Sequence, residues 1–354
     1  NILDILEIDK TFAEEESPVI KYLFYGMVKA PSLLRLGKDK DVIANCDTAI
    51  ELLPSFSPAW FNKGVALMNL KNYDEALKCF DKAIEYGPDE GKALLQKGRI
   101  FFYRNNYDEA LKCFDKAIEY GELGEFLSEA QVYRGRCLLE HFQYKESLIC
   151  FDKALEADPN NINALSLKGH VMYNLGMYTE ALSCFDKALE IEPDNTTLLS
   201  NKAGTLIDLR RYEEASQSLD RALGIDPSFG HAWHNKGRMY ARNNNYQEAK
   251  ECLQKAIDFD SNNIGAWLHL GAVNNRLTNY QDAIRCFAKA YSARSSIPPH
   301  LKVLMESGIT ELARRVLQFD NIDALDLDLV LIYCAKQIDE KLYHEIKSLL
   351  EKTA

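Results

Sequence analysis

The segment YDEALKCFDKAIEY fills residues 73–86 and recurs letter for letter at residues 107–120. Looser copies follow along the chain, and each copy opens on a tyrosine: Tyr73, Tyr107, Tyr144, Tyr178, Tyr212, Tyr246 and Tyr280. The steps between these tyrosines are 34, 37, 34, 34, 34 and 34 residues. A period in this range is typical of a solenoid of two-helix units, in which each unit buries its apolar face against its neighbours. The sequence therefore predicts an all-α array of stacked helix pairs.

Other positions keep the same period if each unit starts sixteen residues before its tyrosine. In the first unit, positions 8 and 20 are small (Gly64, Ala76), position 24 is large and apolar (Phe80), position 27 is Ala83 and position 32 is Pro88. Small residues let the two helices approach closely, and large ones fill the space between units. Proline stops the second helix and turns the chain into the next unit.

These columns resemble the tetratricopeptide repeat (TPR) family, whose pattern W-x2-L-G-x2-Y is followed by A, F, A and P at the same spacings. The resemblance covers residues 57–297, about two-thirds of the chain, and implies a right-handed superhelical TPR solenoid (an α-α superhelix) of seven clear units. The predicted units are residues 57–90, 91–124, 128–161, 162–195, 196–229, 230–263 and 264–297. A degenerate unit at residues 23–56 is predicted from Ala30, Val42, Ala49 and Pro54. The 37-residue step predicts a longer loop at residues 121–127.

Composition limits the classes of partner. The net charge is −11, which argues against nucleic acid, because phosphate binding needs a basic surface. No apolar run approaches the ~20 residues that a membrane helix needs, so we expect a cytoplasmic protein that contacts no membrane. Six of the nine cysteines occupy position 23 of their units. Because packed helices lie ~8–10 Å apart, too far for a disulfide, we expect free, half-buried thiols.

The resemblance also implies a concave groove lined by positions 2, 5, 6, 9, 12 and 13 of each first helix. Position 9 supplies Arg99, Arg136, His170 and Arg238, a basic column in an acidic protein. Since a groove concentrates the field of its charges, this column favours an anionic ligand. The alternative is that the arginines pair with groove acids, for which the candidates are Glu129, Glu140 and Asp208.

Further groove positions extend the predicted site. Apolar anchoring is expected from three residues: Phe61, Leu95 and Phe102. Hydrogen bonds to an extended ligand are expected from three asparagines at position 6: Asn62, Asn201 and Asn235. The alternative is that these asparagines are solvated polar residues with no ligand. Asn62 and Lys92 match only two of the five positions of the chaperone-tail-binding TPR subtype, so we predict no such adaptor. His231, His234 and His269 lack a nearby groove carboxylate or cysteine, so we expect hydrogen-bonding histidines such as His234 and no metal.

Two flanking segments complete the organisation. Residues 1–22 begin with mixed apolar and acidic residues, Ile2 to Asp9, which suit the groove if the segment folds back into it. Residues 298–354 predict helices that cap the final unit or form a small docking or dimerisation module.

Because the sequence has no P-loop, dinucleotide fingerprint, HExxH or nucleophile elbow, we predict no enzyme and no cofactor. The predicted function is a non-catalytic scaffold or adaptor that binds an acidic and apolar peptide segment in the groove. The alternatives are a structural or oligomerisation module acting through the C-terminal helices, an RNA-binding helical repeat, or a regulatory subunit of an enzyme.

Overall fold

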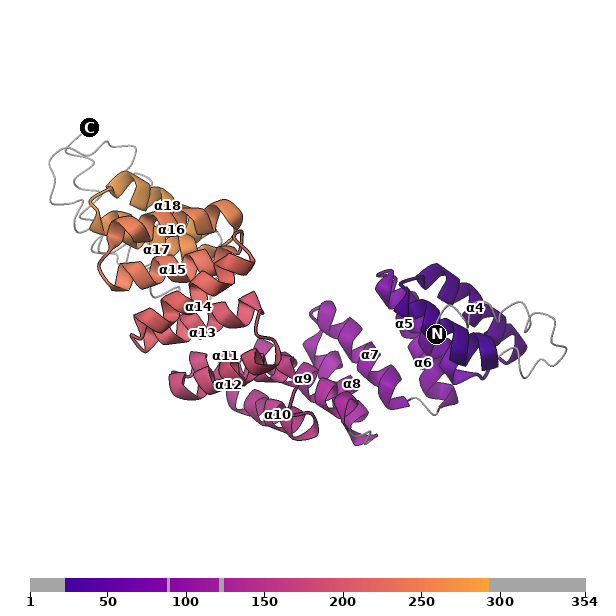
Figure 1. Cartoon of the computed structure of the whole chain (residues 1–354). Helices are drawn as coiled ribbons and strands as arrows, with labels where there is room; N and C mark the ends of the chain where they lie inside the picture. Colours follow the sequence, from indigo (N-terminus) through magenta and orange to yellow (C-terminus); the bar gives the residue numbers. More distant parts are fainter. Residues whose placement is uncertain (1–22, 88–89, 121–123, 293–354) are drawn as a thin grey trace, which may run out of the picture. The chain divides into compact units, whose positions relative to one another are not determined.

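The computed structural model describes residues 23–87, 90–120 and 124–292, and this part of the chain holds helices and no strands (Figure 1). The chain forms two compact units, residues 1–171 and 172–354, called here the N-terminal and C-terminal units. The helices of the first are η1 (Phe24–Lys29), α3 (Ala30–Arg35), α4 (Asp39–Leu52), α5 (Ser57–Asn69), α6 (Tyr73–Tyr86), α7 (Glu90–Tyr103), α8 (Tyr107–Glu119), α9 (Glu125–Glu140), α10 (Tyr144–Ala157) and α11 (Ile162–Asn174), in which the division falls. Those of the second are α12 (Tyr178–Ile191), α13 (Thr196–Asp208), α14 (Tyr212–Ile225), α15 (Gly230–Arg242), α16 (Tyr246–Phe259), α17 (Ile264–Arg276) and α18 (Tyr280–Ser292). The predicted all-α architecture of consecutive helix pairs is confirmed.

In the pairs α5/α6, α7/α8, α9/α10, α15/α16 and α17/α18, a glycine of the first helix lies against a large side chain of the second. The two helices of each of these pairs contact each other, and α6, α8, α14 and α16 pack against the first helix of the next pair. A Cβ atom on Gly98 of α7 would lie 2.5 Å from the ring of Phe114 on α8, so only glycine allows this approach. Phe114 itself is fully buried. The small residue at position 8 and the large one at position 24 are therefore two halves of one contact.

An ion pair that the sequence did not suggest links successive helix pairs. A lysine or arginine at position 7 of a first helix reaches an aspartate on the preceding second helix, as in Lys168–Asp152 (2.5 Å) and Lys236–Asp220 (2.6 Å). The basic side chains are largely buried and the aspartates are exposed. Because such exposed pairs contribute only about 0–1 kcal/mol each, they fix the register of neighbouring pairs more than they stabilise the fold.

The degenerate unit and the unit after the 37-residue step are both helix pairs. The degenerate unit is a helix pair, η1 and α3 followed by α4, and its column residues Ala30, Val42 and Ala49 are fully buried. At the 37-residue step, α9 begins at Glu125 and is 16 residues long, against 13 for α11. The connection between α8 and α9 is residues 120–124, one residue longer than the connection at residues 158–161. Most of the insertion therefore lengthens a helix, where we expected a longer loop.

The cysteine column is buried rather than half-buried. Its six members are free thiols: Cys79, Cys113, Cys150, Cys184, Cys252 and Cys286. Burial raises the pKa of Cys79 and of Cys113 to about 11, and that of Cys286 to about 12. Since the thiolate is the reactive form, these thiols serve as packing residues.

Two predictions lie outside the described residues: the role of residues 1–22 in the groove and the cap or docking module at residues 298–354. Among the helices that are described, none has the length and apolar character needed to cross a membrane.

Candidate functional site

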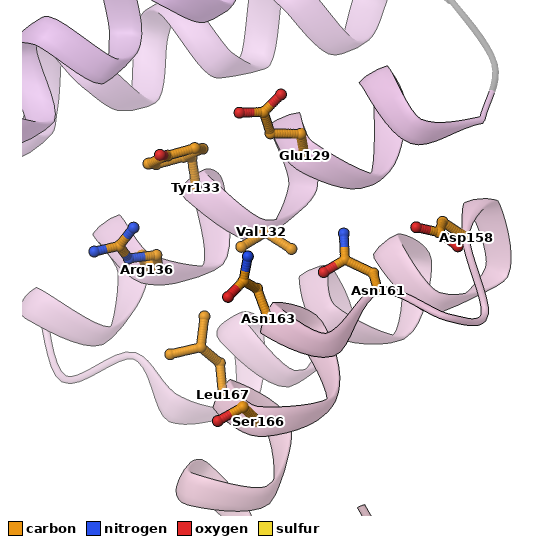
Figure 2. A pocket seen from close by; sticks show the side chains of 9 residues that line it. All are labelled: Glu129, Val132, Tyr133, Arg136, Asp158, Asn161, Asn163, Ser166 and Leu167. Atoms are coloured by element: carbon orange, nitrogen blue, oxygen red, sulfur yellow. The ribbon is translucent and has the colours of Figure 1, made fainter. Parts of the chain in front are cut away.

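The N-terminal unit contains a pocket of about 550 Å³ between α9 and α11 (Figure 2). Helix α9 contributes positions 2, 5, 6 and 9 of its repeat, and α11 contributes positions 2, 5 and 6 of the next, which are all predicted groove positions. The lining side chains are Glu129, Val132, Tyr133 and Arg136 from α9, Asp158 and Asn161 from the preceding turn, and Asn163, Ser166 and Leu167 from α11. The pocket combines an apolar wall, amide and hydroxyl groups, and both signs of charge.

Arg136 is the cation of this pocket. Its guanidinium carbon lies 4.4 Å from the centre of the Phe102 ring and 5.1 Å from that of Tyr133. No carboxylate among the described residues lies within ion-pair distance of it. Stacking on aromatic faces holds an arginine in place while its N–H groups stay open to an acceptor. Arg136 is therefore positioned to receive a carboxylate from a ligand.

Arg99, one repeat earlier, is already paired. Its guanidinium lies 3.2 Å from a carboxylate oxygen of Glu129 and 5.3 Å from the Tyr133 ring, and it donates to Gln96 at 3.0 Å. The charge of Glu129 is therefore partly neutralised by Arg99. The sequence left open whether the groove arginines bind a ligand or pair with acids of the groove. Arg99 pairs with a groove acid, Glu129.

An aromatic cluster supports both arginines. The hydroxyls of Tyr103 and Tyr133 lie 3.3 Å apart, and the Phe102 ring packs edge-on against both rings. Burial raises the pKa of Tyr133 to about 12, while its hydrogen bond lowers the pKa of Tyr103. Tyr133 and Phe102 are buried, and Tyr103 is 49% exposed. Both hydroxyls remain neutral donors and acceptors near neutral pH.

The C-terminal unit uses its groove positions differently, in a network centred on Asp208. This carboxylate accepts from Arg238 at 2.5 Å, Arg242 at 2.9 Å and the hydroxyl of Tyr173 at 2.6 Å. Arg238 also donates to the carbonyl of Gly204 at 3.1 Å. The side chains of Asp208 and Arg238 are only 9% and 13% exposed. Arg238 was predicted to contact a ligand, but like Arg99 it pairs with an acid of the chain itself.

Two histidines lie in the same unit. Nε2 of His234 is 3.1 Å from Nδ1 of His269, and Nδ1 of His269 is 2.7 Å from the carbonyl oxygen of Gly265. A carbonyl only accepts, so we assign the proton on His269 to Nδ1, which leaves His234 Nε2 as an acceptor. Burial lowers the pKa of His234 well below its ordinary value and that of His269 to about 4. Both rings are therefore neutral at pH 7.

The remaining predicted residues are distributed between core and surface. Leu95 is buried and Phe61 packs on Phe80, while Lys92 and His170 are exposed and Asn201 is half-buried. Two of the position-6 asparagines bond backward to the preceding first helix: Asn62 to the carbonyl of Gly26 at 2.9 Å, and Asn235 to that of Ser200 at 3.0 Å.

Sequence reasoning missed the pocket residues Tyr133, Asn163 and Ser166. The column rule that selected Arg136 also marks these positions, but among uncharged polar residues only the asparagines at position 6 were singled out. Among the described residues, no cluster of three or more His, Cys, Asp or Glu side chains is arranged to hold a metal ion.

The helix pairs and their groove positions can now be set beside known proteins. The tetratricopeptide repeat family matches residues 57–90, 95–162 and 230–263. The chain is a TPR protein. A further match to residues 140–222 is the family described as anaphase-promoting complex, cyclosome, subunit 3. No curated protein matches the TPR chain.

Two solved structures with TM-scores above 0.5 agree on the fold of this TPR protein. A chain of the APC/C hetero-tetramer Cut9–Hcn1 is 15% identical with a TM-score of 0.58, over 77% of this chain and 52% of that one. A TPR protein from Parabacteroides merdae is 19% identical with a TM-score of 0.53, over 75% of this chain and 99% of that one. YrrB, a TPR protein with an unusual peptide-binding site, is 27% identical with a TM-score of 0.45, over 54% of this chain and 97% of that one. The family supports a role as a protein-interaction scaffold.

Proposed function

We propose that this TPR protein is a non-catalytic scaffold that holds a peptide segment with acidic and apolar residues in the pocket between α9 and α11. The observation that carries the proposal is Arg136, which is held on aromatic rings, faces the pocket and has no carboxylate partner among the described residues. A ligand carboxylate completes this site, because charge-assisted hydrogen bonds to arginine are strong and directional.

The other pocket residues indicate the rest of the ligand. Val132 and Leu167 offer an apolar wall for one side chain, and Asn163 is exposed on α11, where its amide can bond the backbone of an extended peptide. The net charge of −11 disfavours nucleic acid as the ligand. A protein or peptide partner is therefore the class that fits the site.

The proposal is tested with a phage-displayed library of random twelve-residue peptides selected on the intact chain. Enriched peptides should carry Asp or Glu beside a large apolar residue. In fluorescence anisotropy with such a peptide, Arg136→Ala should raise Kd about tenfold, the size expected for one lost charge-assisted contact.

The matched control is Lys116→Ala, which removes the same charge from an exposed position on α8. It should leave Kd unchanged, and Leu167→Ala should raise Kd through loss of the apolar wall. Equal effects of Arg136→Ala and Lys116→Ala, or enriched peptides without acidic residues, would overturn the proposal.

A further inference from the structure

The repeat of residues 128–161 is unusual on the opposite side from its pocket, on the second helix. Phe142 in the turn before α10 is 67% exposed, and Ile149 on α10 is 55% exposed. The six other clear repeats hold no large apolar residue at either position. Position 15 is Lys71, Asn105, Gly176, Arg210, Asn244 or Thr278, and position 22 is Lys78, Lys112, Ser183, Gln217, Glu251 or Arg285. Two solvent positions of one repeat have thus become apolar.

Phe142 also adopts a backbone conformation that its side chain disfavours. Its φ angle is +58°, in the left-handed region that glycine and asparagine tolerate best. The same turn is left-handed in every clear repeat, where it holds Asn105 (φ 57°), Asn244 (φ 63°) or Gly176 (φ 77°), and also Lys71, Arg210 or Thr278 (φ 59–61°). The turn is therefore part of the repeat, and what distinguishes Phe142 is a large apolar side chain that is exposed and recovers little of the conformational cost by burial.

One charge beside Ile149 changes as well: position 18 becomes Lys145, while Lys153 stands at position 26, which is basic in all seven clear repeats. Lys145 and Lys153 lie four residues before and after Ile149, on the same stripe of α10. Position 18 is acidic in three other repeats (Asp74, Asp108 and Glu213), whereas here it is Lys145. Neither lysine has an ion-pair partner among the described residues. Of the acids beside Ile149, Asp152 is paired with Lys168, which leaves Glu146 as the acid that opposes two lysines.

These four side chains define what we call the α10 surface: Phe142, Lys145, Ile149 and Lys153. Ile149 lies five residues after the first residue of α10, about 7.5 Å along the helix axis, and Phe142 lies two residues before the helix begins, so one partner segment can span both. We propose that the α10 surface docks a protein segment presenting a large apolar side chain between carboxylates, independently of the pocket. The exposed aromatic and aliphatic residues anchor the segment, and the two lysines select acidic neighbours.

The test uses the full chain with Arg136→Ala, so that the pocket does not dominate the selection, and a random sixteen-residue peptide library displayed on phage. Enriched peptides should place Asp or Glu on both sides of a large apolar residue. For such a peptide, Phe142→Asn/Ile149→Gln should raise Kd at least tenfold, and Lys145→Glu/Lys153→Glu should also raise it. The matched control, Ile225→Gln/Phe259→Asn, removes similarly exposed apolar residues from the C-terminal unit and should have no effect.

Stability gives an independent readout. Because asparagine tolerates the left-handed turn, Phe142→Asn/Ile149→Gln should raise Tm by about 2–4 °C while it abolishes binding. Loss of binding therefore cannot be ascribed to unfolding.

Three results would overturn the proposal. The first is no enrichment above that obtained on the Phe142→Asn/Ile149→Gln variant. The second is equal weakening of binding by the control variant. The third is a concentration-dependent dimer in sedimentation velocity that this variant abolishes, which would make the α10 surface an interface between two copies of the chain.

Discussion

Arg136 in the N-terminal unit and Arg238 in the C-terminal unit occupy the same position of the repeat, yet their surroundings differ. Arg238 meets Asp208, which stands at position 13 of the preceding repeat, and the pair is nearly buried. The equivalent residue before Arg136 is Tyr103. With no carboxylate there, Arg136 lies on the rings of Phe102 and Tyr133 and keeps its donors open.

This difference shows what decides the role of a basic column in a helical repeat. For Arg136 and Arg238, the residue at position 13 of the preceding repeat separates the two outcomes, Tyr103 in one case and Asp208 in the other. Arg99 is neutralised from the other side, by Glu129 at position 2 of the next repeat. A tyrosine leaves an open anion site, and an aspartate gives a closed network in which Tyr173 and Arg242 also take part. The same repeat scaffold thus holds an arginine with open donors in the N-terminal unit and a closed ion-pair network in the C-terminal unit.

The largest expected effect comes from opening the closed network. Asp208→Ala leaves the nearly buried guanidinium of Arg238 without a counter-charge. Removing one partner of a buried ion pair costs about 3–5 kcal/mol. Urea unfolding, with amide hydrogen exchange reporting on residues 172–292, should show the loss in the C-terminal unit.

The corresponding change in the N-terminal unit is the control. Glu129→Ala breaks the Arg99 pair, whose acid is 42% exposed, so water replaces the lost partner and the cost should stay below about 1 kcal/mol. Similar losses of stability for Asp208→Ala and Glu129→Ala would contradict the distinction between the closed network of Asp208 and the open site at Arg136.

The second effect is a dependence of stability on pH that is confined to the C-terminal unit. Burial holds the pKa of His269 at about 4 and that of His234 well below 6.5, so the folded state keeps both rings neutral. As the pH falls below 6.5, the unfolded chain binds protons that the folded chain does not. Stability is therefore nearly full above pH 6.5 and declines by about 2 kcal/mol by pH 5 through His269, and His234 adds to the decline in the same direction. Thermal unfolding between pH 7.5 and 5 measures this decline.

His234→Gln/His269→Gln keeps hydrogen-bonding groups without a titratable ring and serves as the control. It should flatten the profile between pH 7.5 and 5, in which few carboxylates titrate. An unchanged slope in this variant would show that other groups govern the acid response.

The repeat columns predicted the helix pairs because each column reflects a packing requirement that recurs in every unit, as Gly98 and Phe114 show. The same columns placed Arg136 at the pocket. They did not separate Arg136 from Arg99 and Arg238, because pairing depends on residues about 30 positions away on another helix. Burial likewise turned Leu95, a predicted ligand contact, into a core residue. Local pattern thus determines position, while the partner of a charge depends on tertiary structure.

A single substitution should make the open site at Arg136 more like the closed network of Asp208. Tyr103→Asp places a carboxylate where Asp208 stands in the other unit, within the neighbourhood of Arg136. Tyr103 is 49% exposed, so the stability change should stay within about 1 kcal/mol. Affinity for an acidic peptide should fall about tenfold, equivalent to about 1.4 kcal/mol, because the new carboxylate competes for the guanidinium and repels the ligand. Fluorescence anisotropy with a peptide selected on the native chain measures this.

Tyr103→Asn separates charge from shape in that experiment. It removes the ring and its hydroxyl contact with Tyr133 as the aspartate does, but adds no charge. If neutralisation of Arg136 closes the site, the asparagine variant binds the peptide much as the native chain does and only the aspartate variant loses affinity. Raising the salt concentration should then narrow the gap between the two variants, since exposed charges are screened. If both variants lose affinity equally, the tyrosine ring itself contacts the ligand, and position 13 acts through shape rather than through its charge.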